Sequence, residues 1–125
     1  MMTATAPMNR VIFIGFLGKD AEVKTTRNDA SFTVLSLATK RSWKDRESGE
    51  RKSETTWHRC IVWGKLGEFA GTLTKGTHVQ VEGEIRTREY MQKAPAGKPA
   101  GAKSITEVRA FSIAKLDRST KEAAA

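Results

Sequence analysis

Two tryptophans lie six residues apart in the stretch TTWHRCIVWGKL, residues 55–66. In a helix, which turns by about 100° per residue, the two indoles would lie on different faces. In a β-strand, side chains alternate between two faces, so Trp57, Arg59, Ile61 and Trp63 share one of them. Flat rings can stack nucleobases, and a guanidinium group between them can attract a phosphate. A strand here therefore predicts a surface that binds nucleic acid.

Two further aromatic residues lie in basic runs. Trp43 belongs to KRSWK, and Tyr90 ends RTREY. Stacking a base on such a ring stabilises binding by about 1–3 kcal/mol and works for any base, because every base has a π face. We therefore expect base stacking on Trp43, Trp57, Trp63 and Tyr90, with phosphate contacts from Arg41, Lys44, Arg59, Arg86 and Arg88.

Each of these residues also has a structural interpretation. A tryptophan in a strand is most often a core residue, so Trp57 or Trp63 taken alone could be buried. Tyr90 could pack at a sheet edge, and residues 44–52 mix both signs of charge, as a solvated loop does. Four rings that all lie next to cations favour the binding interpretation.

The opposite face of the same strand carries His58, Cys60 and Val62. His58 has no nearby histidine or carboxylate pair, so we expect a structural hydrogen bond, with a place at a subunit contact left open. Cys60 is the only cysteine and cannot form an internal disulfide. We expect it to be a small buried apolar side chain.

Motifs for catalysis or cofactor binding do not occur in the sequence. It lacks the phosphate cradle GxxxxGK[ST] and the motifs GxSxG and HExxH. It also lacks paired Cys/His spacings for zinc and an acid/base pair of carboxylates. We therefore expect a binding module that is not an enzyme and needs neither metal nor cofactor.

The net charge is +8, from 22 lysines and arginines against 14 acidic residues in a chain of 125. This surplus suits a polyanionic partner, because each phosphate contact releases condensed counterions, although charge alone fits many basic proteins equally well. Apolar runs stay below the roughly 18 residues of a membrane span. The N-terminal MMTATAPM lacks the regions of a signal peptide, so we expect a cytoplasmic protein.

Strands are the main elements that must position these side chains. Runs rich in β-branched and aromatic residues, bounded by turn residues, predict strands over residues 10–18, 21–26, 31–40, 56–63, 77–91 and 104–116. Leu66, Phe69, Ala70 and Leu73 recur at helical spacing and predict one short helix within residues 64–76.

The predicted helix lies between the strands over residues 56–63 and 77–91. One short helix between the third and fourth barrel strands is typical of the OB fold, an all-β, five-stranded Greek-key barrel. Two long connections leave the predicted barrel, a charged hairpin over residues 41–55 and a Pro/Gly/Ala/Lys loop over residues 92–103. We expect both to be mobile until a ligand orders them. The predicted domain spans residues 8–117, between a disordered extension over 1–7 and a polar tail over 118–125.

Five stretches follow the pattern of a known family: MNRVIFIGFLGKDAEVK, FTVLSLAT, TTWHRCIVWGKLGE, KGTHVQVEGEIRTREY and a final TEV. Together they closely resemble bacterial single-stranded DNA-binding protein over residues 8–117. The resemblance implies an OB fold and a homotetramer. It also implies sequence-independent binding and protection of single-stranded DNA in replication, recombination and repair.

The resemblance assigns roles position by position. It assigns base stacking to Trp43, Trp57, Trp63 and Tyr90. It assigns a place along the DNA path to Arg59, Lys65, Arg86 and Arg88, and a subunit contact to His58. Trp63 stands where phenylalanine is common and Tyr90 where tryptophan is common, so both remain usable stacking platforms. Phe16 departs from the small or polar residue that is usual at its position.

The C-terminal end also departs from the family pattern. Members that recruit replication and repair enzymes carry a long tail rich in Gly, Pro and Gln, with an acidic and apolar tip. This sequence ends at KEAAA without such a tail, as a naturally short form or a shortened chain would. We therefore do not expect tail-mediated recruitment of other proteins.

Three functions remain open, in order of preference. The first is coating of single-stranded DNA, with about 4–16 nucleotides per barrel crossing the face of Trp57 and Trp63. The second is an RNA-binding or primosome-accessory OB protein, because recognition of the 2′-hydroxyl cannot be read from sequence. The third is an OB-barrel nuclease or nucleotide-processing enzyme.

Overall fold

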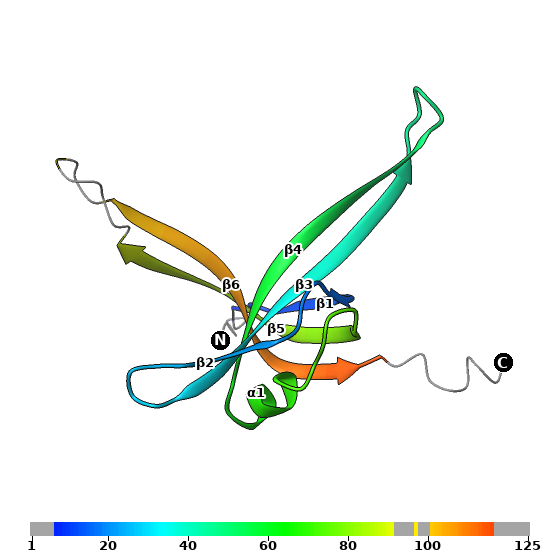
Figure 1. Cartoon of the computed structure of the whole chain (residues 1–125). Coiled ribbons are helices and arrows are strands. Elements are labelled where there is room, and N and C mark those ends of the chain that lie inside the picture. Colours follow the sequence, from blue (N-terminus) through cyan, green and yellow to red (C-terminus); the bar gives the residue numbers. More distant parts are fainter. Residues whose placement is uncertain (1–6, 92–96, 98–100, 117–125) are drawn as a thin grey trace, which may run out of the picture.

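The computed structural model describes residues 7–91, 97 and 101–116, and is shown in Figure 1. Most of the predicted extension, the predicted tail and most of the loop over residues 92–103 lie outside these residues. The elements, in chain order, are β1 (Val11–Leu17), β2 (Glu22–Thr25), β3 (Ser31–Lys44), β4 (Arg51–Trp63), α1 (Gly64–Ala70), β5 (His78–Met91) and β6 (Ala102–Lys115).

Five of the strands close into a barrel. The sheet order is β1-β5-β6-β4-β3-β2, and an additional pairing of β1 with β3 closes the ring. Among the residues described, the short strand β2 pairs with β3 alone and lies outside this ring. Helix α1 follows the third barrel strand and precedes the fourth. The predicted five-stranded OB-fold barrel with one short helix is therefore confirmed.

Alternation along the strands builds the core. On β3 and β4 the inward residues are aliphatic or small, with Leu35, Leu37, Cys60 and Val62 fully buried. Val79 and Val81 on β5 meet them from the opposite wall of the barrel, together with Leu17, Val108 and Ala110. Burying such side chains contributes about 25 cal/mol per Å² of apolar area, so the barrel interior is the main source of stability.

Helix α1 closes one end of the barrel through Ala70, with Leu73 just beyond its end. The Thr33 hydroxyl donates a 2.7 Å hydrogen bond to the Gly67 carbonyl, which brings the helix close to β3. The predicted apolar stripe is only partly buried, since Phe69 is 40% exposed. A helix of seven residues has room for one contact face, and the close approach at Gly67 directs Phe69 away from the barrel.

Two hairpins extend well beyond the barrel and diverge from it, as Figure 1 shows. The first continues the β3–β4 ladder without interruption to the pair Lys44 and Arg51, and the second continues β5–β6 to Met91 and Ala102. The predicted strands over residues 31–40 and 56–63 were therefore too short, since β3 extends to Lys44 and β4 begins at Arg51. Strand residues beyond the barrel have no core to face, so the apolar alternation that marks a strand is lost there.

Gly15→Ala should lower the free energy of unfolding by about 1–3 kcal/mol. A β-carbon at Gly15 would lie 2.1 Å from the Ala38 carbonyl oxygen, and backbone cannot move aside cheaply. Urea titration followed by circular dichroism measures the change. Gly101→Ala is the matched control, because its β-carbon would meet nothing within 4 Å. Equal stability of the Gly15 variant and the wild type would contradict this close approach of β1 and β3.

Candidate nucleic-acid interface

The two tryptophans of β4 point out of the barrel. Trp57 is 59% exposed and Trp63 is 38% exposed, whereas Cys60 and Val62 between them are fully buried. Both indoles therefore lie on the outer face of the strand, as the alternation predicts. The interpretation of these tryptophans as core residues is wrong.

Each indole is supported by a neighbour while it stays exposed. Phe32 lies opposite Trp63 in the β3–β4 register, with ring centroids 4.8 Å apart and planes tilted by 35°. The Trp57 ring packs over Gly18, where a β-carbon would come within 2.3 Å of the indole. The absence of a side chain at Gly18 therefore fixes where the Trp57 ring can lie.

A groove of about 430 Å³ runs along this outer face, next to Trp63. Strand β4 supplies one side of it, and strands β5 and β6 supply the other. One part is apolar and the rest is dominated by guanidinium groups. The lining consists of Phe32, Arg59, Ile61, Trp63, Arg86, Thr87, Arg88, Glu107 and Arg109. Aromatic rings beside arginines can stack bases and contact phosphates at once.

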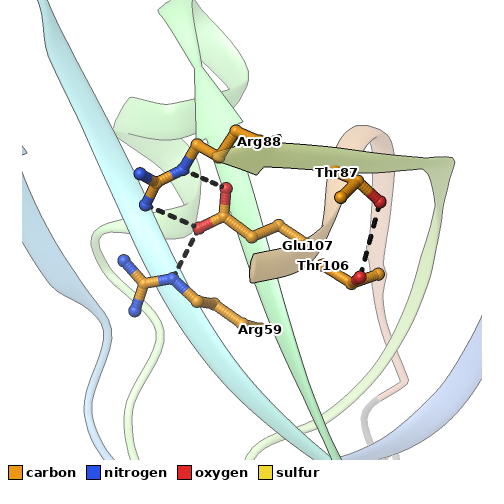
Figure 2. Close-up of polar contacts among 5 residues, drawn as sticks. All are labelled: Arg59, Thr87, Arg88, Thr106 and Glu107. Atoms are coloured by element: carbon orange, nitrogen blue, oxygen red, sulfur yellow. Dashed lines mark hydrogen bonds and ion pairs between the residues drawn. The ribbon is translucent and has the colours of Figure 1, made fainter. Parts of the chain in front are cut away.

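Glu107 joins the two sides of the groove. Its Oε2 atom accepts a 2.7 Å hydrogen bond from Arg59 Nε on β4, and its Oε1 atom accepts a 2.9 Å bond from Arg88 Nε on β5. Arg88 Nη2 also donates to Oε2 at 3.3 Å. Figure 2 shows the carboxylate between the two guanidinium groups. On the neighbouring residues of the same hairpin, Thr87 and Thr106 contact each other.

This ion-pair network changes the acidity of its members. Burial raises the pKa of Glu107, but hydrogen bonds and charge from Arg88 and Arg59 outweigh it, so the net pKa falls below 4.5. The bond to Glu107 raises the pKa of Arg88. Glu107 and Arg88 therefore remain ionised at neutral pH, and the network joins one carboxylate to two guanidinium groups.

Two further arginines line the groove. Arg86 lies opposite Glu107 in the β5–β6 register, but its Nε atom donates to Glu84 at 3.0 Å. Arg109 lies opposite Glu84 on β6. Tyr90 lies further along β5, on the same face as Arg86, and is 45% exposed. The structure thus brings Trp57, Arg59, Trp63, Arg86, Arg88 and Tyr90 to one side of the sheet.

Trp43 is not part of this face. The register pairs Trp43 with Lys52, and by strand alternation both share a face with His58 rather than with Trp57. Trp43 is half-buried, and the Arg41 guanidinium lies over its ring, 4.8 Å from the centroid. The predicted stacking role of Trp43 stays a prediction, on the other side of the hairpin.

The remaining predicted residues lie apart from the groove. Lys44 is exposed at the end of β3, and Lys65 is exposed in the first turn of α1. His58 is half-buried, stacks on Phe13 at 3.8 Å and hydrogen-bonds with Thr39 Oγ1 at 2.8 Å. Burial lowers the pKa of His58. The structural hydrogen bond is therefore present, and the subunit contact stays a prediction.

Sequence reasoning missed several residues of the interface. Phe32, Glu107 and Arg109 line the groove without having been singled out. Lys19 and Arg59 border a second cavity of about 160 Å³ beside Trp57. Phe32 and Arg109 could have been found from alternation once the strand partners were known, because each shares a face with a predicted residue.

The described residues show neither a metal centre nor a membrane helix. They contain no group of three or more His, Cys, Asp or Glu side chains placed to hold a metal ion. Nor do they form a helix with the length and apolar character that crossing a membrane requires.

Burial raises the pKa of Cys60 to about 12, so its thiol stays protonated at neutral pH.

The barrel and its groove define an OB-fold protein with exposed aromatic rings among arginines. The family model described as "Single-strand binding protein family" matches residues 8–116. The chain therefore belongs to the single-strand binding protein family.

Two solved structures illustrate this similarity. One is a Plasmodium falciparum SSB in complex with ssDNA, with TM-score 0.73 and 28% identity over 92% of this chain and 100% of that one. The other is a deletion mutant of the single-stranded DNA-binding protein from Thermus aquaticus, with TM-score 0.70 and 30% identity. That match covers 90% of this chain and 52% of the other, so this chain spans about half of that protein's length.

Replacing Glu107 by glutamine should make the free energy of unfolding less dependent on pH in the acidic range. The lowered pKa of Glu107 means that its stabilising contribution is complete above about pH 4.5 and is lost as pH falls through the folded-state value. At neutral pH Glu107→Gln should lower the free energy of unfolding by about 1–3 kcal/mol. Urea titrations between about pH 7 and pH 3 should show this difference narrowing. A difference that stays constant over that range would contradict the role assigned to the ion pairs.

Proposed function

We propose that this protein binds and protects single-stranded DNA without regard to base sequence. The observation that carries the proposal is the row on β4, where two exposed indoles flank Arg59 beside a groove lined with arginines. Membership of the single-strand binding protein family and the similarity to an SSB in complex with ssDNA support it.

Base stacking and phosphate contacts both contribute to the affinity for single-stranded DNA. Bases stack on Trp57, Trp63 and Tyr90, each ring stabilising the complex by about 1–3 kcal/mol. Phosphates contact the arginines of the groove and the basic residues of the β3–β4 hairpin. Affinity for phosphates should fall as salt rises, because the counterions released on binding gain less entropy in a more concentrated salt solution, and the net charge of +8 suits this kind of binding. Neither contribution depends on which base is present.

The cellular role that fits such binding is protection of single strands exposed during replication, recombination and repair. We place the protein in the cytoplasm. Stacking and phosphate contacts hold a strand without bond breakage, so this function includes no catalytic step.

A homotetramer forms part of this proposal, and an exposed apolar row on β1 supports it. Ile12, Ile14 and Phe16 are each more than half exposed on the outer face of this strand. Phe16 stacks on His78 at 4.4 Å, and Phe111 on β6 is 55% exposed. Apolar side chains gathered on one face mark a surface that another protein covers. A second copy of this chain is the occupant that we propose.

The edge of β1 offers a second self-association surface. Residues 11–15 pair with β5 on one side, while the pairing with β3 involves only Phe16 and Leu17. Within the described residues, the first part of β1 thus has a strand neighbour on one side only. An edge and a face that are both self-complementary generate two different two-fold contacts. Two such contacts together close a tetramer with dihedral symmetry.

A fluorescence titration with oligo-dT tests the proposed DNA binding. Intrinsic tryptophan emission should be quenched as the exposed indoles stack on bases. Trp57→Ala and Trp63→Ala should each weaken binding by about 1–3 kcal/mol with little change in folding. Raising the salt concentration should weaken binding by the wild type steeply.

An oligo-rU titration and a cleavage assay separate the rival functions. Tighter binding of oligo-rU than of oligo-dT at equal length would favour an RNA-binding protein. Steady cleavage of labelled single strands by pure protein with magnesium would establish a nuclease instead. Unchanged affinity in both tryptophan variants would refute the stacking role of the β4 face.

Ile14→Glu should break the tetramer into smaller species. A carboxylate on the exposed row of β1 would be buried without a partner in any contact that covers the row. Sedimentation velocity or light scattering measures the change in mass. Val23→Glu is the matched control, because Val23 is also exposed but lies on β2. Equal masses for the wild type and the Ile14 variant would contradict the use of this face.

A further inference from the structure

The groove contains an acidic side chain that the binding of a polyanion does not by itself explain. Glu107 is only 7% exposed and lies among Arg59, Arg86, Arg88 and Arg109. A negative charge in this place repels phosphate and cancels part of the attraction of the arginines. A groove that only needed positive charge would bind DNA better without it.

The contacts of Glu107 suggest what it contributes. It engages Arg59 through the Nε atom, and Arg88 through the Nε and Nη2 atoms. Among the described residues, neither Nη atom of Arg59 has a hydrogen-bond partner. Figure 2 shows these Nη atoms pointing away from the carboxylate. The network thus uses one edge of each guanidinium group and leaves N–H donors available on the other side.

A fixed guanidinium group binds an anion with less loss of freedom than a mobile one. The side chains of Arg59 and Arg88 are 37% and 55% exposed, so without a partner both would sample many rotamers. Ordering such a side chain on binding costs free energy, and ordering it beforehand removes that cost. The planar guanidinium is suited to this, because its donors form one rigid fork, so a hydrogen bond at Nε restrains all of them together.

We propose that Glu107 is the positioning residue of the groove, holding Arg59 on β4 and Arg88 on β5 so that their free N–H donors face the phosphates of a bound single strand. This inference rests on the proposed function. It assigns to Glu107 no contact with DNA, because the carboxylate acts through the two arginines.

The neighbouring pair of Glu84 and Arg86 provides a matched control. Glu84 accepts a 3.0 Å bond from Arg86 Nε, and its side chain is 37% exposed, against 8% for Glu107. Each glutamate bonds an arginine that lines the groove, but only Glu107 joins two strands. If negative charge alone mattered, removing either carboxylate should strengthen binding of DNA to a similar degree.

The experiment compares oligo-dT affinity in the wild type, Glu107→Gln, Glu107→Asp and Glu84→Gln at one salt concentration. Positioning predicts affinity about five- to twentyfold weaker in Glu107→Gln. Glu107→Asp should also be weaker, because the shorter side chain keeps the charge but cannot reach both arginines. Glu84→Gln should weaken binding less than Glu107→Gln does, because Glu84 holds one arginine on its own strand whereas Glu107 holds two arginines on different strands. Thermal melting by circular dichroism establishes that each variant is folded. If Glu107→Gln does not fold, the affinity of Glu107→Asp tests the positioning role in its place.

A second arm tests whether Glu107 acts through the arginines. In an Arg59→Ala/Arg88→Ala background, Glu107→Gln should cause no further loss of affinity, because there is nothing left to position. A further loss of the same size as in the wild type would overturn the proposal. A merely structural contribution of Glu107 would persist in this background.

The outcomes separate this inference from the function on which it rests. If the wild type does not bind oligo-dT, the proposed function fails and the positioning role fails with it. If the wild type binds and Glu107→Gln binds equally or more tightly, only the positioning role is overturned. Equal weakening in Glu107→Gln and Glu84→Gln would overturn it as well.

Discussion

The two-residue repeat of side-chain direction along β4 is the constraint on which the groove depends. Cys60 and Val62 are fully buried in the barrel, and a slip of one residue would turn them outward and drive both indoles into the core. Because such a slip would expose apolar side chains and force bulky rings inside, the register is strongly specified. The packing of the core therefore determines the chemistry of the surface.

Closure of the barrel brings the arginines together. Residues from β4 and β5 meet across the groove only because β6 lies between them, pairing in parallel with β4 and antiparallel with β5. Glu107 is on this middle strand, and its two partners come from the strands on either side. The ion pairs therefore link three strands at the surface, in addition to the backbone ladder beneath them.

Much of the fold follows from local patterns. The glycine-bounded helix, the alternation around Trp57 and Trp63, and the buried Cys60 could all be predicted, because each depends on residues within a few positions. The contact of Arg59 with Glu107 joins residues 48 positions apart. It depends on which strand becomes the neighbour of β4, and that choice is made by the closed topology rather than by any local pattern.

The placement of Trp43 could not be predicted for a different reason. Whether Trp43 and Trp57 share a face depends on the register of the hairpin, which is set by the turn between Lys44 and Arg51. One residue more or less in that turn would reverse the answer. Charged turn residues such as those at positions 45–50 carry little information on loop length, so the pattern of the strands leaves this choice open.

The opposite orientation of Trp43 has a consequence for the shape of any polymer that contacts both faces. A nucleic-acid strand that stacks on Trp57 and also on Trp43 must bend sharply around the edge of the β3–β4 hairpin, from one face to the other. Duplex DNA has a persistence length of about 150 base pairs and resists such curvature. A single strand, with freely turning bonds between unstacked bases, bends there at small cost. Stiffness by itself would then exclude the double helix from this path, without any recognition of base pairing.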